Sequence, residues 1–333
     1  MVGNRMVPGP GSLTPETEKR KEEDKNNMDE LKRRLLTRQT GYWTDCFPAA
    51  VFLSLMLMLV GMMFSSVLEH VTGIKTVLQS FGNDAAAEFA EFYLSFAGIW
   101  IAFFLFANKG NRPMLSCLAF RKDGRNRRGA LIGLGLGVLT NGFCILMSCL
   151  TGDIHLMFNE FRPELFLLFF AAVLIQSGAE EIVDRCYLYQ KLRRGYMEPW
   201  MAIGVNSLVF MAMHLPNDGI NTAGKVQIIL IGILFSLFVY YYDSLWAAIM
   251  MHTGWNFTQS ILFGLPNSGT VSSYSLFKLE AASARSGLFY NVNFGVEGSI
   301  GAVVVIGILL AAVLRRNLGK GEKRDLWASP AVK

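Results

Sequence analysis

The chain has 333 residues, of which 52% are hydrophobic and 17% are charged, and its formal net charge is +5. Its mean hydropathy is +0.34. This composition is too apolar for a soluble domain of that length, so it excludes a soluble enzyme and predicts an all-α integral membrane protein.

Apolar stretches of about 17–25 residues recur along the chain, and each is long enough to cross a bilayer as a helix. About eight of them start near Phe47, Glu88, Ala130, Leu165, Pro199, Val226, Leu245 and Ile300. The sequence therefore predicts a polytopic membrane bundle of about eight transmembrane helices over residues 42–317. A polar tail (1–41) precedes this domain, and a second polar tail (318–333) follows it.

Lysine and arginine gather in alternate connections between the predicted spans. They stand at Lys32–Arg38 before the first span, at Arg121–Arg128 after the second, at Lys191–Arg194 after the fourth, and at Arg315 and Arg316 after the eighth. Positive residues in short loops accumulate on the cytoplasmic side of a membrane. Eight spans with both termini in the cytoplasm place every basic loop on the cytoplasmic side. This topology explains the basic runs without a nucleic-acid partner.

The polar first forty residues affect how the protein is expected to reach the membrane. No apolar segment precedes the first span, which is therefore expected to act as the targeting signal. We expect a multi-pass protein of the cell membrane in a prokaryote, or of an endomembrane in a eukaryote. Within the tail, Met28, Leu31, Leu35 and Leu36 recur at helical spacing, which is typical of a short helix on the inner membrane surface. A solvated, disordered tail is the alternative.

Three local patterns carry structural predictions. Gly133, Gly135 and Gly137 lie in the third span with no strand before them, so we expect Gly133 and Gly137 to allow close helix packing rather than to hold a nucleotide. The run SLFKLEAA in the polar connection 266–298 predicts a short helix or an edge strand over the bundle. The five cysteines show neither disulfide nor metal spacing.

Ionisable side chains inside the spans are few, and each costs at least about 2.5–3.5 kcal/mol to insert. Such residues normally face a bundle interior or a wet cavity and mark function. They form three groups: Glu180, Glu181, Asp184 and Arg185 in the fourth span, His214 at the end of the fifth, and His252 with Asn256 in the seventh. A helical rise of about 1.5 Å per residue places the three groups at overlapping depths. The sequence therefore predicts one intramembrane polar cavity.

Within each group, residues four positions apart share one helix face. These residues form the motifs EExxxR (180–185), FxxxH (210–214) and HxxxN (252–256). In order and in placement on separate spans, they resemble those of the CAAX prenyl protease type II and bacteriocin-processing family (CPBP, or Abi) of intramembrane proteases. The resemblance covers residues 165–260, the expected catalytic core, and reaches the outer spans only by topology.

The resemblance implies an intramembrane endopeptidase whose substrate is a membrane-associated protein or peptide. Glu180 is the expected general base, since a poorly solvated carboxylate beside a cation is poised to take a proton from water. His214 is expected to orient that water, and His252 and Asn256 to donate hydrogen bonds to the oxyanion. Glu181 and Arg185 would support these groups, and Phe210 would pack beside them.

Two alternatives stay open at this point. Glu180, His214 and His252 are the two-histidine, one-carboxylate set of a catalytic zinc, but no HExxH is present, so catalysis without a cofactor is favoured over zinc. A proton-coupled transporter and a non-catalytic membrane scaffold are the competing functions, because intramembrane carboxylates and histidines also form proton relays. The sequence does not name the substrate, and prenylated proteins are one class among several.

Overall fold

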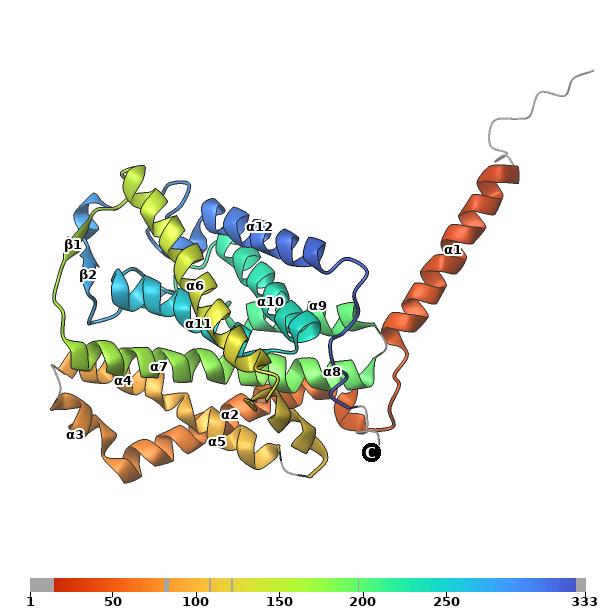
Figure 1. Ribbon diagram of the computed structural model, residues 1–333, viewed down its shortest axis with the longest axis horizontal. Helices are drawn as coiled ribbons and strands as arrows, with labels where there is room; N and C mark the ends of the chain where they lie inside the picture. The colour runs from red at the N-terminus through yellow and green to blue at the C-terminus, as the bar shows by residue number, and fades with distance from the viewer. Residues whose placement is uncertain (1–14, 81–83, 108, 121, 197, 328–333) are drawn as a thin grey trace, which may run out of the picture.

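A computed structural model describes residues 15–327 except 81–83, 108, 121 and 197, and this part of the chain is mostly helical (Figure 1). The helices are α1 (Pro15–Leu36), α2 (Phe47–Thr72), α3 (Ile74–Gln79), α4 (Asp84–Ser95), α5 (Ala97–Phe106), α6 (Arg125–Leu150), α7 (Pro163–Glu181), α8 (Tyr189–Gly195), α9 (Pro199–Met213), α10 (Thr222–Tyr242), α11 (Leu245–Phe257) and α12 (Ile300–Arg316). Two π-helical segments, η3 (Ile182–Leu188) and η4 (Thr258–Leu262), continue α7 and α11. Strands β1 (Leu156–Phe158) and β2 (Phe277–Leu279) form an antiparallel pair.

Five helical segments within the described residues are long and apolar enough to cross a membrane. They are Phe47–Val71, Asp84–Phe106, Arg125–Leu150, Pro163–Gly195 and Thr222–Tyr242, and they support the predicted integral membrane protein. The other three predicted spans coincide with shorter helices, namely α9, α11 with η4, and α12. At about 1.5 Å per residue, a helix as short as α9 falls short of a hydrocarbon core of about 30 Å. The count of eight spans stays a prediction.

Helices α6 and α11 approach each other closely at two glycines. A Cβ on Gly133 would collide with the backbone oxygen of Ala247, and a Cβ on Gly137 with that of Met251. Gly135, by contrast, has no described neighbour within 4 Å of the same position. Close contact between membrane helices requires such small residues. The predicted packing role of Gly133 and Gly137 is confirmed.

One long helical rod, α7–η3–α8, carries the first motif through the molecule (Figure 1). It begins at Pro163, and proline is favoured in a first helical turn because its missing N–H costs no hydrogen bond there. The π-helical η3 follows directly after Glu181, and such segments occur frequently at functional sites. Asp184 and Arg185 lie within it and are fully buried.

The far end of the rod is anchored on Asp45, which precedes α2. Arg194 donates two hydrogen bonds of 2.6 Å to the Asp45 carboxylate, and Lys191 Nζ lies 3.5 Å from Asp45 Oδ1. The run Lys191–Arg194, predicted as a connection after the fourth span, is therefore part of the helix. Burial alone would raise the pKa of Asp45, but hydrogen bonds from Arg194 and Thr40 and the nearby cations hold that pKa below its ordinary value.

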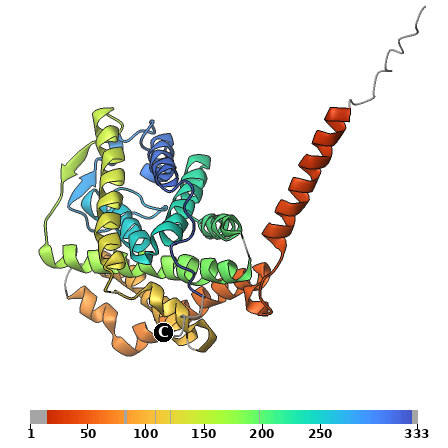
Figure 2. The same ribbon diagram turned by 45° about the vertical axis from the view of Figure 1, so that its right-hand side comes forward.

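The two ends of the molecule differ in structure. Strands β1 and β2 lie at the end opposite α1 and α8 (Figure 1, Figure 2). The run SLFKLEAA contains both predicted alternatives, because Phe277–Leu279 is a strand and Ala281–Ser283 is a short 3₁₀ turn. Helix α1 has 22 residues and projects away from the bundle (Figure 2). Residues 1–14 and 328–333 of the predicted tails, and Arg121 of the basic run, lie outside the described residues.

Candidate active site

The first and third motifs meet at Glu181. Its Oε1 lies 3.0 Å from His252 Nδ1 and accepts a hydrogen bond of 3.1 Å from Arg185 Nη1. All three side chains are buried. When Nδ1 of an imidazole donates to a carboxylate, Nε2 of the same ring is left as an acceptor. Glu181 therefore fixes the ring of His252 and the direction of its second nitrogen.

Glu180 faces that second nitrogen. Its Oε2 is 3.8 Å from His252 Nε2, which is too long for a direct hydrogen bond. Its Oε1 accepts a hydrogen bond of 2.5 Å from Gln176 Nε2. Oε2 is buried and makes no hydrogen bond within the described part of the chain. One carboxylate oxygen is thus held in place, and the other is available to a water molecule beside His252.

Two aromatic rings enclose the Arg185 guanidinium. Its Cζ lies 4.3 Å from the ring centre of Phe210 and 5.3 Å from that of Phe235. Its Nη2 donates a hydrogen bond of 3.4 Å to the backbone oxygen of Gly232 in α10. A guanidinium over π faces is stabilised electrostatically, so Arg185 is held as a buried counter-charge for Glu181. Phe210, the first residue of the second motif, therefore contacts the first motif.

A small cavity of about 30 Å³ lies between α9, α10 and α11. Its lining includes His214, His252 and Asn256, together with Ser268 and Glu297 from the connection before α12. A cavity of this size holds about two water molecules and excludes a peptide segment. Glu180 is not among its lining residues, so the single polar cavity expected to gather all the motif residues stays a prediction.

The two histidines occupy different places relative to Glu180. His252 lines the cavity and also lies beside Glu180, which is not itself a lining residue. His214 caps the C-terminus of α9, and its Nδ1 lies 2.8 Å from the backbone oxygen of Phe210. Its Nε2 is the ring nitrogen left for other contacts. Among the described residues, no hydrogen bond joins His214 to Glu180.

Asn256 connects the third motif to Glu180 through a chain of amides. Its Nδ2 donates a hydrogen bond of 3.3 Å to Gln176 Oε1, and Gln176 in turn donates to Glu180. Its Oδ1 accepts a hydrogen bond of 3.1 Å from Asn267 Nδ2. Buried amides that are paired at both ends have a fixed orientation. Asn256 is therefore held at the cavity by groups from two separate parts of the chain.

Residues 162–258 match the family model described as type II CAAX prenyl endopeptidase Rce1-like. This match supports the predicted resemblance to the CAAX prenyl protease and bacteriocin-processing family over that segment of the chain. The matched segment runs from the residue before α7 into η4 and contains all three motifs. No curated protein and no solved structure matches the chain.

Gln176 and Glu297 are polar residues of this candidate site that the sequence prediction did not include. Gln176 lies four residues before Glu180, which is the spacing that grouped the other motif residues. The same spacing could therefore have identified Gln176 from the sequence. Glu297 gave no such signal, because it is a single acid in the long connection and lies outside the matched segment.

Glu297 is nevertheless built into the cavity wall. Its Oε1 accepts a hydrogen bond of 3.2 Å from Trp255 Nε1 in α11. Its Oε2 accepts hydrogen bonds from the backbone N–H of Ser268 at 2.9 Å and from its hydroxyl at 3.2 Å. Burial raises the pKa of Glu297 above its ordinary value, although these Ser268 contacts and the nearby histidines oppose that rise. Glu297 thus joins the outer connection to α11.

The zinc ligands suggested by the sequence do not converge in the candidate site. His252 Nδ1 faces Glu181, and its Nε2 is 3.8 Å from Glu180. Zinc would require ligand atoms at about 2.0–2.2 Å around one point. Within the described residues, no three His, Cys, Asp or Glu side chains are placed to hold a metal ion. The residues in this arrangement do not fit a zinc ion.

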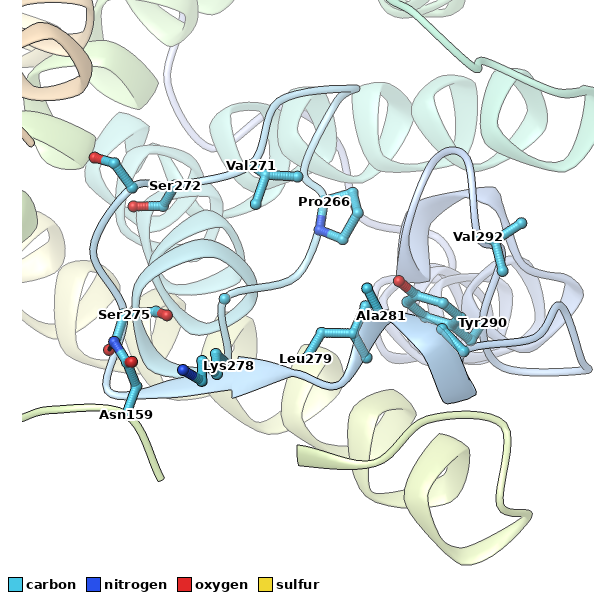
Figure 3. Close-up of a pocket in the computed structure, with 13 residues that line it drawn as sticks. Asn159, Pro266, Val271, Ser272, Ser275, Lys278, Leu279, Ala281, Tyr290 and Val292 are labelled. Carbon is cyan, nitrogen blue, oxygen red and sulfur yellow. Dashed lines mark hydrogen bonds between the residues drawn. The ribbon is translucent and has the colours of Figure 1, made fainter. Parts of the chain in front are cut away.

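A larger hollow of about 610 Å³ lies at the connection between η4 and α12 (Figure 3). Pro266 and Val271 stand on one side of it, and Lys278 and Leu279 of β2 stand on another (Figure 3). Between Pro266 and Val271, residues 267–270 form a tight turn closed by two backbone hydrogen bonds of 2.8 and 2.9 Å. Ser268 in this turn lines the small cavity, and Pro266 and Val271 on either side of the turn line the hollow.

Proposed function

We propose that this protein is an intramembrane endopeptidase of the CAAX type, which hydrolyses a peptide bond of a membrane-associated protein or peptide with water activated by Glu180. One observation carries the proposal. Glu180 Oε2 is buried, unpaired among the described residues and 3.8 Å from His252 Nε2. A single water placed between these two acceptors would donate a hydrogen bond to each of them.

The reaction follows from that placement. Glu180 removes a proton from the water while the water oxygen forms a bond to the carbonyl carbon of the substrate. The electron pair of the C=O π bond moves to the carbonyl oxygen and gives a tetrahedral intermediate. When the pair returns, the C–N bond breaks, and the leaving amine takes the proton from Glu180. Glu180 is thus base in the first step and acid in the second.

The contacts favour an exchange of the two histidine roles expected from sequence. His252 is the ring beside Glu180, so it is assigned to orient the water. His214 and Asn256 line the cavity and are assigned to the oxyanion, with His214 donating from Nε2 when it is protonated. A good oxyanion donor contributes about 3–4 kcal/mol. Glu181, Arg185 and Phe210 hold His252 and balance the charge.

The proposal requires no metal ion. A carboxylate base, an oriented water and neutral or cationic N–H donors are sufficient for amide hydrolysis. The arrangement of Glu180, His214 and His252 also supports this assignment, since the three do not surround a common point.

The experiment that tests the function compares membrane proteins of cells that carry the wild-type protein with cells that carry Glu180→Gln. We expect one or more membrane-associated polypeptides to accumulate uncleaved in the variant. Glu280→Gln, an exposed acid of the outer connection, is the matched control and should leave processing intact. Normal processing in a folded Glu180→Gln protein would contradict the protease and leave the transporter or the scaffold.

A further inference from the structure

Asn206 lies on the same face of α9 as the second motif, four residues before Phe210. Asn206, Phe210 and His214 therefore form one row along the helix. Phe210 contacts the Arg185 guanidinium, and His214 lines the cavity. Asn206 is fully buried, and a buried amide normally has hydrogen-bond partners. Those partners show what this end of the row contacts.

The Asn206 side chain is bonded to the π-helical segment η3. Its Nδ2 donates a hydrogen bond of 2.7 Å to the backbone oxygen of Asp184, whereas the Asp184 Oδ1 lies 3.5 Å from the same nitrogen. The Asp184 backbone oxygen also accepts the N–H of Tyr189, five residues later, which is the hydrogen bond of a π-helical turn. A carbonyl oxygen has two lone pairs and can accept both donors. Asn206 thus holds the backbone of this turn.

Ser236 of α10 sets the orientation of the Asn206 amide. Its Oγ lies 2.9 Å from Asn206 Oδ1 and also 2.9 Å from the backbone oxygen of Gly232. Because the Asp184 backbone oxygen can only accept, Asn206 turns its NH₂ group to Asp184 and its Oδ1 to Ser236. The Gly232 oxygen is the one that also accepts from Arg185 Nη2. One turn of α10 therefore contacts both the amide and the guanidinium.

The spacing of η3 determines the direction of Arg185 relative to Glu181. A π-helical turn contains about one residue more than an α-helical turn, and one residue corresponds to about 100° of rotation. Return of η3 to α-helical spacing would turn the residues that follow away from Glu181. Arg185 lies within η3, and its guanidinium contacts both Glu181 and Phe210. These contacts therefore depend on the π-helical turn at Asp184.

We propose that Asn206 is a positioning residue, which holds the π-helical turn at Asp184 and thereby fixes the direction of Arg185. Ser236 supports it by keeping the amide in the orientation that this contact requires. The role rests on the proposed function, in which the ion pair of Arg185 with Glu181 holds the imidazole beside the catalytic base. Asn206 does not line the cavity, so it acts on the reaction through η3.

Hydrogen exchange tests the contact with η3 in the full-length protein without any substrate. Asn206→Leu removes both hydrogen bonds at similar volume, and Ser236→Ala removes the support. Ser207→Ala is the matched control, because this buried hydroxyl donates to the backbone oxygen of Ile203 within its own helix. We expect the amides of residues 182–189 to exchange about tenfold faster in Asn206→Leu and about threefold faster in Ser236→Ala. Unchanged exchange in Asn206→Leu, or equal acceleration in Ser207→Ala, overturns the proposal.

A kinetic arm distinguishes positioning from a general loss of stability. The probe is a peptide that the wild-type protein cleaves, selected from a pool of randomised peptides. Asn206→Leu should lower kcat about 20-fold and change KM by less than about twofold. In a Glu181→Gln background the same substitution should lower kcat by less than about twofold, because the orientation of the imidazole is already lost. An unchanged kcat, or an equal loss in both backgrounds, overturns the positioning role.

The support by Ser236 has its own kinetic signature. Ser236→Ala should lower kcat about fivefold by itself and have no further effect in a protein that carries Asn206→Leu, because it acts through that amide. Ser207→Ala should change neither kcat nor KM. Additive losses in the double variant would overturn the role of Ser236. Absence of cleavage by the wild-type protein would instead contradict the proposed function, and the exchange rates would still decide whether Asn206 holds η3.

Discussion

Glu181 Oε1 lies 3.0 Å from His252 Nδ1, although the two residues are 71 positions apart in the chain. The same oxygen accepts a hydrogen bond from Arg185, so one buried atom joins the first motif to the third. In the proposed mechanism, each residue of the EExxxR motif has a separate task. Glu180 activates the water, Glu181 orients the imidazole, and Arg185 balances the charge.

Glu181→Gln should reduce peptide hydrolysis by about 10²–10⁴-fold, because loss of the orienting carboxylate frees the His252 ring and leaves Arg185 without its counter-charge. The measurement is kcat on a cleaved peptide, with folding checked by size-exclusion chromatography. Arg185→Lys keeps the charge but loses the planar contact with Phe210 and Phe235, so it should retain more activity than Arg185→Ala. Full activity in Glu181→Gln would rule out the orienting role.

The Asp45 anchor predicts a dependence of stability on pH. The pKa of Asp45 is lower in the folded chain than its ordinary value of about 3.9. Its charged form therefore favours the folded state, and this contribution is complete above about pH 4 and is lost as the pH falls through the lower, folded pKa. Thermal unfolding in detergent from pH 7 to pH 2 should show this loss in the wild-type protein and a smaller one in Asp45→Asn.

At pH 7, Asp45→Asn should lower the free energy of unfolding by about 3 kcal/mol, because Arg194 and the buried Lys191 lose their partner. Asp29→Asn on the exposed helix α1 is the control and should have no measurable effect. Equal stability of the two variants would show that the anchor contributes little.

The contact between α6 and α11 predicts opposite effects at two glycines. Gly137→Ala should destabilise the bundle by about 1–3 kcal/mol, since its Cβ meets the backbone of α11. Gly135→Ala, with open space at that position, should be neutral or stabilising by up to about 1 kcal/mol through helix propensity. The midpoint of thermal unfolding in the same detergent measures both, and a reversed order would contradict the packing.

Metal dependence can be settled directly. We expect elemental analysis of the purified protein to find less than stoichiometric zinc, and we expect peptide hydrolysis to survive exhaustive chelation, because the proposed base is a carboxylate and not a metal-bound water. Stoichiometric zinc whose removal abolishes cleavage would require a rearranged site, since the side chains as placed do not surround a metal ion.

Glu297→Gln should loosen the 267–270 turn. The loss of charge weakens the contacts with Ser268, and one net hydrogen bond of about 1.4 kcal/mol corresponds to a tenfold change in local opening. Hydrogen exchange of a peptide covering the turn should therefore accelerate by about tenfold. Glu280→Gln should leave the exchange of this peptide unchanged, and identical rates in both variants would contradict the role of Glu297 in holding the turn.

Several features of the protein followed from sequence because they depend on local order. A side chain on a helix has its neighbours three and four positions away, so the pairings of Glu181 with Arg185 and of Phe210 with His214 were visible as spacing. The same holds for Gly133 and Gly137, whose shared face needed no knowledge of the partner helix. Apolar composition, likewise local, predicted an integral membrane protein.

The number of membrane crossings was harder to predict from the sequence. Hydropathy measures whether a segment tolerates lipid, and segments buried inside a bundle have the same composition as segments that face lipid. The predicted spans that start near Pro199, Leu245 and Ile300 correspond to helices that are shorter than a typical crossing.

Sequence by itself determined the class of protein, the helix faces and the three motifs, because each of these depends on residues within a few turns of one helix. Only the tertiary structure decided that His252 rather than His214 stands beside Glu180, that Phe235 closes over Arg185, and that Glu297 completes the cavity wall. Those contacts join segments far apart in the chain. Their geometry is set by how whole helices and the outer connection pack together, and the spacing of residues within any single helix does not encode it.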